Sequence, residues 1–172
     1  MKKKLLVSAV CCIVLGGAAW AHETKTFSNK DLNGTYAESF SGFASASPAT
    51  SGAGSFSTGS TFPESGTGTL TADGKGNFQA SLTFNTGGLL CSGTVAGTYT
   101  VNADGTGTSR GVFTPNAAPS GLPPQIVYLC PSGGGNQDEA FTIVGSKKVN
   151  FVSTDSDTTI SGTAIRQNHG DD

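Results

Sequence analysis

Acidic side chains and two histidines are the residues of this chain whose chemistry could drive a reaction. The 172 residues include twelve Asp and Glu but only two His, His22 and His169, which lie near the two ends. A Ser-His-Asp or Cys-His relay needs a histidine held rigidly beside the nucleophile. Because both histidines fall in the terminal segments, we predict no such relay and assign no catalytic residue.

Paired carboxylates are the acid–base arrangement that the composition leaves open. Two acids at the right separation are enough for glycoside hydrolysis, and several acids fall in or beside the expected strands. Their spacing selects no pair, so we expect each to be solvated or to cap a turn. These acids are Glu38, Glu64, Glu139, Asp104 and Asp138.

The spacing of ligand residues does not indicate a metal site. Cleavage after Ala21 would make His22 the first residue, whose amine and ring could hold copper, but the only second histidine is His169. The sequences Asp155-Ser156-Asp157 and Asp73-Gly74-Lys75-Gly76-Asn77 lack the acidic ligand at position 12 of a calcium-binding loop. We therefore predict turns at both places, and neither a metal nor another cofactor.

The cysteines and the start of the chain indicate export. Residues 1–21 combine a basic start, an apolar run and a small-residue end, the three parts of a secretory signal peptide. Two of the four cysteines would leave with it, and an oxidising compartment would favour a disulfide between Cys91 and Cys130. A redox or metal pair is the alternative, although neither cysteine has a second Cys or a His nearby. We predict a periplasmic or extracellular protein without a transmembrane segment after cleavage.

The charge balance argues against nucleic acid as a partner. Without the three lysines of the signal peptide, seven Lys and Arg face twelve Asp and Glu, a net charge of about −5. Phosphate binding depends on clustered Lys and Arg. The one basic pair left is Lys147-Lys148, which falls in a predicted turn.

Two matching hairpins indicate the fold. Ala72-Asp73-Gly74-Lys75-Gly76-Asn77 and Ala103-Asp104-Gly105-Thr106-Gly107-Thr108 place Asp-Gly turns between runs in which apolar and small polar residues alternate. We predict an all-β protein, a single antiparallel up-and-down barrel of about eight strands, because closure removes exposed strand edges. The expected strands cover residues 32–43, 66–72, 77–84, 90–101, 108–113, 125–130, 139–144, 148–153 and 158–167.

Composition divides the rest of the chain. A polar N-terminal arm (22–30) precedes the barrel domain (31–167), and a tail (168–172) follows it. Two Ser/Gly/Pro-rich segments, 44–65 and 115–124, contain few bulky apolar residues and are predicted as long loops.

An outer-membrane barrel is the alternative fold, because such barrels also combine an export signal with eight or more strands. Membrane strands have about nine to eleven residues and end in aromatic girdles. Most of the expected strands are shorter, and no girdle of Tyr and Trp accompanies them, so we do not favour this alternative.

Two short segments resemble calycin-type barrels, the lipocalin and avidin-like group. Asn33-Gly34-Thr35-Tyr36 is similar to the Gly-x-Trp signature on the first strand of that group, with Tyr in place of Trp. The resemblance implies that Arg166, at the end of the last strand, lies across Tyr36 and closes the barrel floor as a cation–π pair. The region from Asp31 to Gln167 also resembles a group of uncharacterised secreted bacterial proteins. This second resemblance does not indicate any particular activity.

The interior of the barrel decides the expected function, because eight strands enclose either packed side chains or one small ligand. We expect a non-catalytic protein that binds a small apolar ligand in the barrel mouth, with Tyr36, Phe40, Tyr99 and Tyr128 as walls and 44–65 as a lid. The alternatives are a filled structural or protein-interaction module of unknown partner, and a barrel-type cyclase or isomerase with a buried acid or Tyr. The expected interior residues are Phe78, Leu82, Phe84, Val95, Tyr99, Val101, Phe113, Phe141, Ile143, Phe151 and Ile160.

The predicted disulfide can be tested by stability. A bond between Cys91 and Cys130 would close a loop of roughly 40 residues, so Cys91→Ser should lower the free energy of unfolding by about 2 to 4 kcal/mol. Thermal melting without reductant is the measurement. Equal melting of the variant and the wild type would show that the bond does not form.

Overall fold

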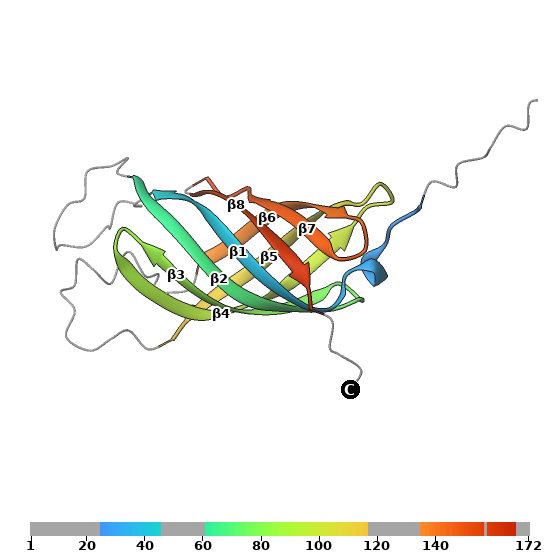
Figure 1. The fold of residues 1–172 in the computed structure, drawn as a ribbon, viewed down its shortest axis with the longest axis horizontal. Coiled ribbons are helices and arrows are strands. Elements are labelled where there is room, and N and C mark those ends of the chain that lie inside the picture. The colour runs from blue at the N-terminus through green and yellow to red at the C-terminus, as the bar shows by residue number, and fades with distance from the viewer. Residues whose placement is uncertain (1–24, 46–60, 117–134, 157, 168–172) are drawn as a thin grey trace, which may run out of the picture.

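Eight antiparallel strands form a closed barrel in the computed structural model (Figure 1). The structure describes residues 25–45, 61–116, 135–156 and 158–167. Each strand pairs with its neighbours in sequence, and the last pairs with the first, which confirms the predicted all-β up-and-down barrel. A single 3-10 turn, η1 (Asn29–Asp31), precedes β1 (Asn33–Ser45), β2 (Thr61–Asp73), β3 (Asn77–Thr86), β4 (Leu89–Val101), β5 (Thr106–Pro115), β6 (Gly135–Val144), β7 (Lys148–Ser153) and β8 (Thr158–Arg166).

Several strands are longer than predicted. Residues 61–65, predicted as part of a loop, belong to β2 and pair with the end of β1. Likewise, β5 reaches Pro115, and β6 begins at Gly135, four residues before the strand predicted at 139–144. Main-chain groups make the ladder, so small side chains do not prevent pairing where a neighbouring strand is available. Six of the eight strands have ten or more residues, and the premise that they are too short to span a membrane is therefore wrong.

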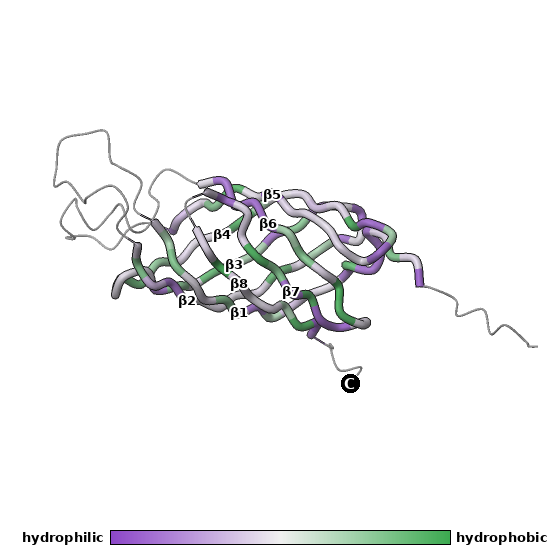
Figure 2. The backbone as a smooth tube through the Cα atoms, turned by 90° about the horizontal axis from the view of Figure 1, so that it is seen from above, coloured by the Kyte–Doolittle hydropathy of each residue, from purple (hydrophilic) through white to green (hydrophobic). Residues whose placement is uncertain are grey.

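The outward face of the barrel carries mainly hydroxyl and amide side chains. Along β3 the exposed residues are Asn77, Gln79, Ser81, Thr83 and Asn85, while the residues between them are buried. Figure 2 shows the same mixture of apolar and polar residues along the other strands. A membrane-spanning barrel presents an apolar band outward, whereas the outward face of the described strands is mainly polar. In the part of the chain that the structure describes, no helix has the length and apolar character of a membrane span.

Glycines opposite aromatic rings allow the narrow barrel to fill. Phe78 on β3 faces Gly97 on β4, and a Cβ at Gly97 would lie 2.7 Å from the Phe78 ring. Phe151 faces Gly162 in the same way. Small barrels commonly alternate large and small interior residues, and here the two sizes stand directly opposite each other on adjacent strands.

The predicted interior is largely confirmed. Of the eleven residues expected there, eight are buried, Val101 and Phe151 are partly buried against the core, and Ile160 is partly exposed. The buried residues that were not predicted include Glu38 and Thr86, whose side chains are polar. Tyr36, predicted as a wall residue, is also buried. The other hydrophobic residues buried beyond the expected list are Leu32, Ala72, Ala80, Cys91, Val149 and Ala164.

The Asp-Gly sequences are turns, as predicted. The Asp73 carboxylate accepts hydrogen bonds from the Lys75 N–H (2.7 Å) and the Asn77 N–H (3.0 Å). These bonds and one from the Asn77 side chain lower the pKa of Asp73 to about 2. Gly74 adopts a φ of 71°, a conformation that costs glycine little. The Asp73 carboxylate therefore stabilises the turn.

Some predictions fall outside the described residues. They are the signal peptide, His22, most of the predicted lid (residues 46–60), residues 117–124 of the second predicted loop, the strand at 125–130, the tail with His169, Cys130 and Tyr128. Cys91 is buried on β4, and its pairing with Cys130 stays a prediction. Among the described strands, the barrel closes through β1–β8 pairing.

The opposition of glycine and aromatic ring predicts a steric penalty. In Gly97→Ala the new Cβ would collide with the Arg110 carbonyl and lie 2.6 Å from the Gly111 Cα. We expect a loss of about 1 to 3 kcal/mol in the free energy of unfolding, as for other overpacked sites, measured in urea. Gly135→Ala is the matched control, because a Cβ there would have no atom within 4 Å. Equal stability of the two variants would contradict this account of the packing.

Candidate functional site

A cavity of about 50 Å³ lies inside the barrel. Every strand contributes to its wall, and Leu32 adds to it from the segment before β1. Most of the wall is apolar, and the polar side chains in it are two carboxyl groups, two tyrosines and one serine. The lining residues are Leu32, Tyr36, Glu38, Leu70, Ala72, Phe78, Tyr99, Ser109, Glu139, Phe141, Val149, Phe151 and Ala164.

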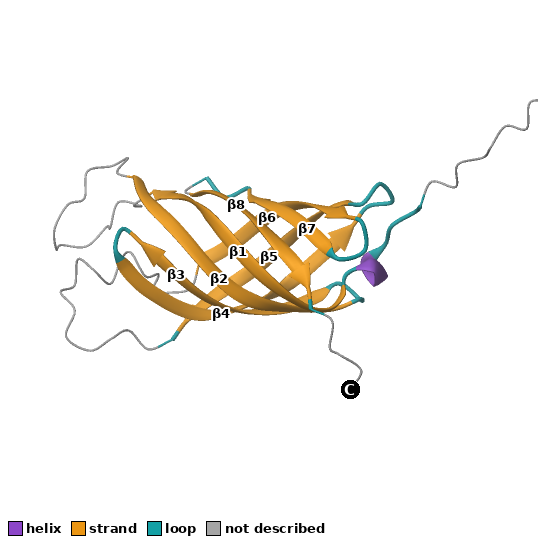
Figure 3. Cartoon of the chain, in the orientation of Figure 1, coloured by secondary structure: helices purple, strands orange, loops and turns teal. Residues whose placement is uncertain are grey.

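The segment containing η1 closes the end of the barrel nearest the cavity. In Figure 3 this turn lies at the opposite end of the barrel from the turn between β3 and β4. The Tyr99 hydroxyl donates a hydrogen bond to the Leu32 carbonyl (2.6 Å), and the Asn29 side chain accepts one from the Val101 N–H (2.8 Å). Farther out, the Phe27 N–H donates to the Ala103 carbonyl (3.0 Å). Residues 27–32, mostly within the predicted polar arm, therefore act as a cap tied to β4 and its following turn.

Glu38 is the most unusual residue of the cavity. It lies on the inner face of β1, opposite Gly68 on β2 and Ala164 on β8, and is only 8% exposed. Its Oε1 is buried without a hydrogen-bond partner among the described residues. A Cβ at Gly68 would lie 3.0 Å from this oxygen, so the glycine makes room for the carboxyl group.

Glu139 is the second carboxyl group of the cavity. It lies on β6 and accepts a hydrogen bond from the Ser109 hydroxyl (3.0 Å) on β5. Burial raises the pKa of Glu139, and the Ser109 bond opposes that rise. Burial also raises the pKa of Glu38 to about 7, and the charge of Glu139 contributes in the same direction. The two acids therefore interact across the cavity, and near neutral pH Glu38 is present in both protonation states.

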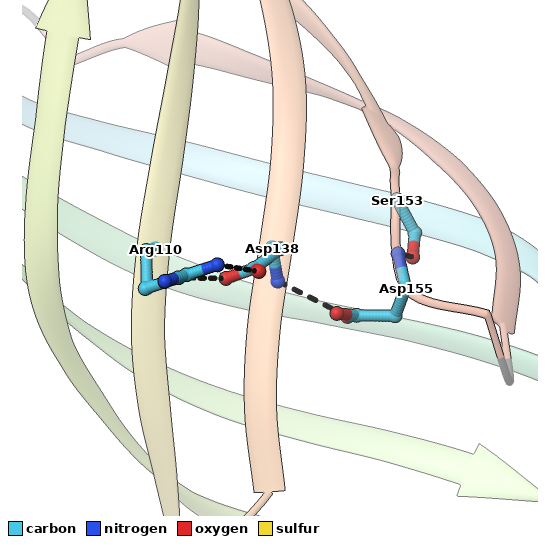
Figure 4. A network of polar contacts seen from close by, with 4 residues as sticks. All are labelled: Arg110, Asp138, Ser153 and Asp155. Carbon is cyan, nitrogen blue, oxygen red and sulfur yellow. Dashed lines mark hydrogen bonds and ion pairs between the residues drawn. The ribbon is translucent and has the colours of Figure 1, made fainter.

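Positive charge lies outside the barrel throughout the described part of the chain. All seven Lys and Arg there are exposed. Arg110, which neighbours Ser109, points outward and forms a two-bond ion pair with Asp138 (2.8 and 2.6 Å). The Asp138 N–H in turn donates to the Asp155 carboxylate (3.0 Å), as Figure 4 shows. This outer network fixes the strands that carry Ser109 and Glu139, but it brings no cation to the carboxyl pair.

Two of the three predicted wall residues that the structure describes line the cavity. Tyr36 and Tyr99 do so, and burial raises the pKa of each hydroxyl. Phe40 instead packs in a row of rings with Phe84 (6.4 Å between centroids), which meets Phe113 (5.5 Å). This row lies toward the end of the barrel that carries the β3–β4 turn. The cavity, which Leu32 of the cap lines, lies at the other end, under the cap.

The predicted closure pair occupies the seam of the barrel. Tyr36 on β1 is the Cα partner of Arg166 on β8. The Arg166 side chain lies over Gly34, with its Nε 3.2 Å from the position of a Cβ there. The cation–π contact between Tyr36 and Arg166 stays a prediction.

A third interior acid lies away from the cavity. Glu64 on β2 accepts a hydrogen bond from the buried Thr86 hydroxyl (2.7 Å) on β3. Burial raises the pKa of Glu64, and the Thr86 bond opposes that rise. The Glu64 carboxylate thus has a hydrogen-bond donor, whereas Oε1 of Glu38 has none among the described residues.

The carboxyl pair was missed in the sequence, although a signal for it is present. Glu38 stands between Tyr36 and Phe40 at inward-facing positions, and Glu139 stands two residues before Phe141. Strand periodicity of two therefore places both acids inside. Within the residues that the structure describes, no three His, Cys, Asp or Glu gather in a group that could hold a metal ion.

Comparison with known proteins identified no relative of this chain. No protein family, curated protein or solved structure matches the chain. The fold and the site therefore rest on the geometry described above.

Burial of Glu38 predicts a specific dependence of stability on pH. Its folded pKa of about 7 lies above the ordinary value of 4.5, so the folded state holds the proton more tightly. Stability is then greatest below pH 4.5 and falls as pH rises through 7, by about 3 kcal/mol for this group. In Glu38→Gln this contribution should be absent, so the total fall should be smaller by about 3 kcal/mol than in the wild type, as measured by urea unfolding from pH 4 to 9.

A solvated carboxyl group provides the control. Gln79→Glu adds one on the exposed face of β3 and should leave the dependence on pH between 5 and 8 unchanged. The same fall in Glu38→Gln as in the wild type would mean that Glu38 is not the group responsible.

Proposed function

We propose that this protein is an exported, non-catalytic barrel that binds a small, mainly apolar molecule inside the barrel, beneath the cap of residues 27–32. The carrying observation is the mainly apolar cavity inside the barrel, lined by Glu38, whose Oε1 is buried without a hydrogen-bond partner among the described residues. Apolar pockets with a few polar groups are the usual form of small-molecule sites. The signal-peptide pattern of residues 1–21 supports export.

The size of the cavity restricts the ligand. About 50 Å³ exceeds the roughly 10 to 15 Å³ that one water needs, but it is far below the roughly 300 to 1,000 Å³ of common ligand pockets. The ligand must therefore be compact, or the cap must move to admit a larger one. The cap is joined to β4 and its turn by a small number of hydrogen bonds, which makes it the natural point of entry.

The likeness to calycin-type barrels supports the same proposal. Tyr36 stands at the position of the signature Trp, and Arg166 lies opposite it across the seam. We propose a distant relationship to that group on these residues alone. Ligand binding inside the barrel would then be shared with it.

Binding can be tested on protein purified from the periplasm or the medium. Native mass spectrometry should show added mass, and compact apolar compounds should raise the melting temperature. Ala164→Leu, which extends a side chain into the cavity, should abolish both effects. Ala37→Leu, at an exposed position of the same seam, should retain them. No added mass and no shift with any compound would refute the proposal and leave a filled structural module.

A barrel-type isomerase or cyclase is the second candidate. Glu38 has a pKa near neutrality, which suits a general acid or base, and two tyrosine hydroxyls share its cavity. If this candidate holds, a bound compound should be recovered chemically altered from the wild type and unaltered from Glu38→Gln. Recovery of the same unaltered compound from both proteins would exclude it.

A further inference from the structure

We propose that the ligand is a small organic amine whose ammonium group lies between the carboxyl groups of Glu38 and Glu139. This inference rests on the binding function proposed above and specifies the class of ligand. It depends on the missing partner of Glu38, the placement of positive charge, and the character of the cavity wall.

The Glu38 carboxyl group lacks a donor. At 8% exposure it has lost most of its contact with water, and Oε1 has no hydrogen-bond partner among the described residues. Structures normally satisfy such buried acceptors, because an unpaired one is costly and a charged one more so. A ligand that donates to Oε1 would supply the interaction that the protein omits.

A cation complements this pair better than a neutral donor. Glu139 adds a second carboxyl group, with the Ser109 hydroxyl as its hydrogen-bond donor. The described Lys and Arg side chains are all exposed, so none neutralises the pair from within. An alcohol could satisfy one acceptor but would leave the charge uncompensated, and an anion would be repelled. An ammonium group offers up to three donors and a positive charge.

The wall suits the rest of an alkylamine. Aromatic rings of Tyr36, Phe78, Tyr99 and Phe141 line the cavity. Such rings pack against an alkyl body and also attract a cation over their faces. The volume of about 50 Å³ limits the body to a few carbon atoms.

The protonation of the wall sets the pH at which an amine binds. The titratable groups facing Glu38 are Glu139 on β6, Tyr36 on β1 and Tyr99 on β4, and both tyrosines are neutral below their raised pKa. Glu38 must lose its proton to pair with an ammonium group. Amine affinity should therefore rise between pH 6 and 8, whereas alcohol affinity should change little.

Three probes of matched shape test the inference. Isobutylamine, isobutyl alcohol and isobutyrate differ in charge but share one carbon skeleton, and their binding can be followed by NMR titration of the whole protein. At pH 8 the amine should bind at least about tenfold more tightly than the alcohol, and isobutyrate should not bind. In Glu38→Gln the preference for the amine should fall below about twofold.

Glu64→Gln is the matched control. Glu64 is also an interior acid, but it is bonded to Thr86 and does not line the cavity, so this variant should keep the preference for the amine. Equal affinity for amine and alcohol in the wild type would overturn the inference and leave the binding proposal standing. A preference that survives Glu38→Gln, or is lost in Glu64→Gln, would also overturn it. Binding of none of the probes, together with no added mass, would overturn both.

Discussion

The narrow interior of an eight-stranded barrel limits which side chains this protein can place inside. The interior of such a barrel is just wide enough for side chains to fill it, so a large ring can enter only where the facing strand carries no side chain. Gly97 opposite Phe78 and Gly162 opposite Phe151 satisfy this requirement. Gly68 does the same for a carboxyl group, that of Glu38. One steric rule therefore explains both the packed core and the placement of a polar group within it.

Glu38 opposes the stability of the fold that holds it. A carboxyl group taken from water into apolar surroundings favours its neutral form, and its nearness to Glu139 strengthens that preference. A residue that only needed to fill space at this position would be apolar. Proteins retain such local costs mainly at sites that bind or react. The unsatisfied oxygen is the strongest reason to look for function inside the barrel rather than in its turns.

Much of the fold was readable because two local signals agree. The Asp-Gly turns fixed neighbour-to-neighbour strand order, and the alternation of apolar and polar residues identified inward-facing positions such as Phe78, Leu82 and Phe84. Strand ends were less accurate, since pairing of residues 61–65 depends on the presence of β1 rather than on their own side chains. The carboxyl pair was not predicted, because Glu38 and Glu139 are 101 positions apart and only closure of the barrel brings them to one cavity.

The seam between β1 and β8 has a consequence for how the barrel assembles. Every other strand pairing joins consecutive strands, whereas Tyr36 pairs with Arg166 across most of the chain. Contacts so distant in sequence carry the largest entropic cost of loop closure and tend to form late in folding. Glu38 lies on this seam opposite Ala164, so we expect its carboxyl group to leave water when the seam closes. The barrier to closure, and not the formation of the hairpins, is therefore where the protonation of this acid would affect the rate of folding.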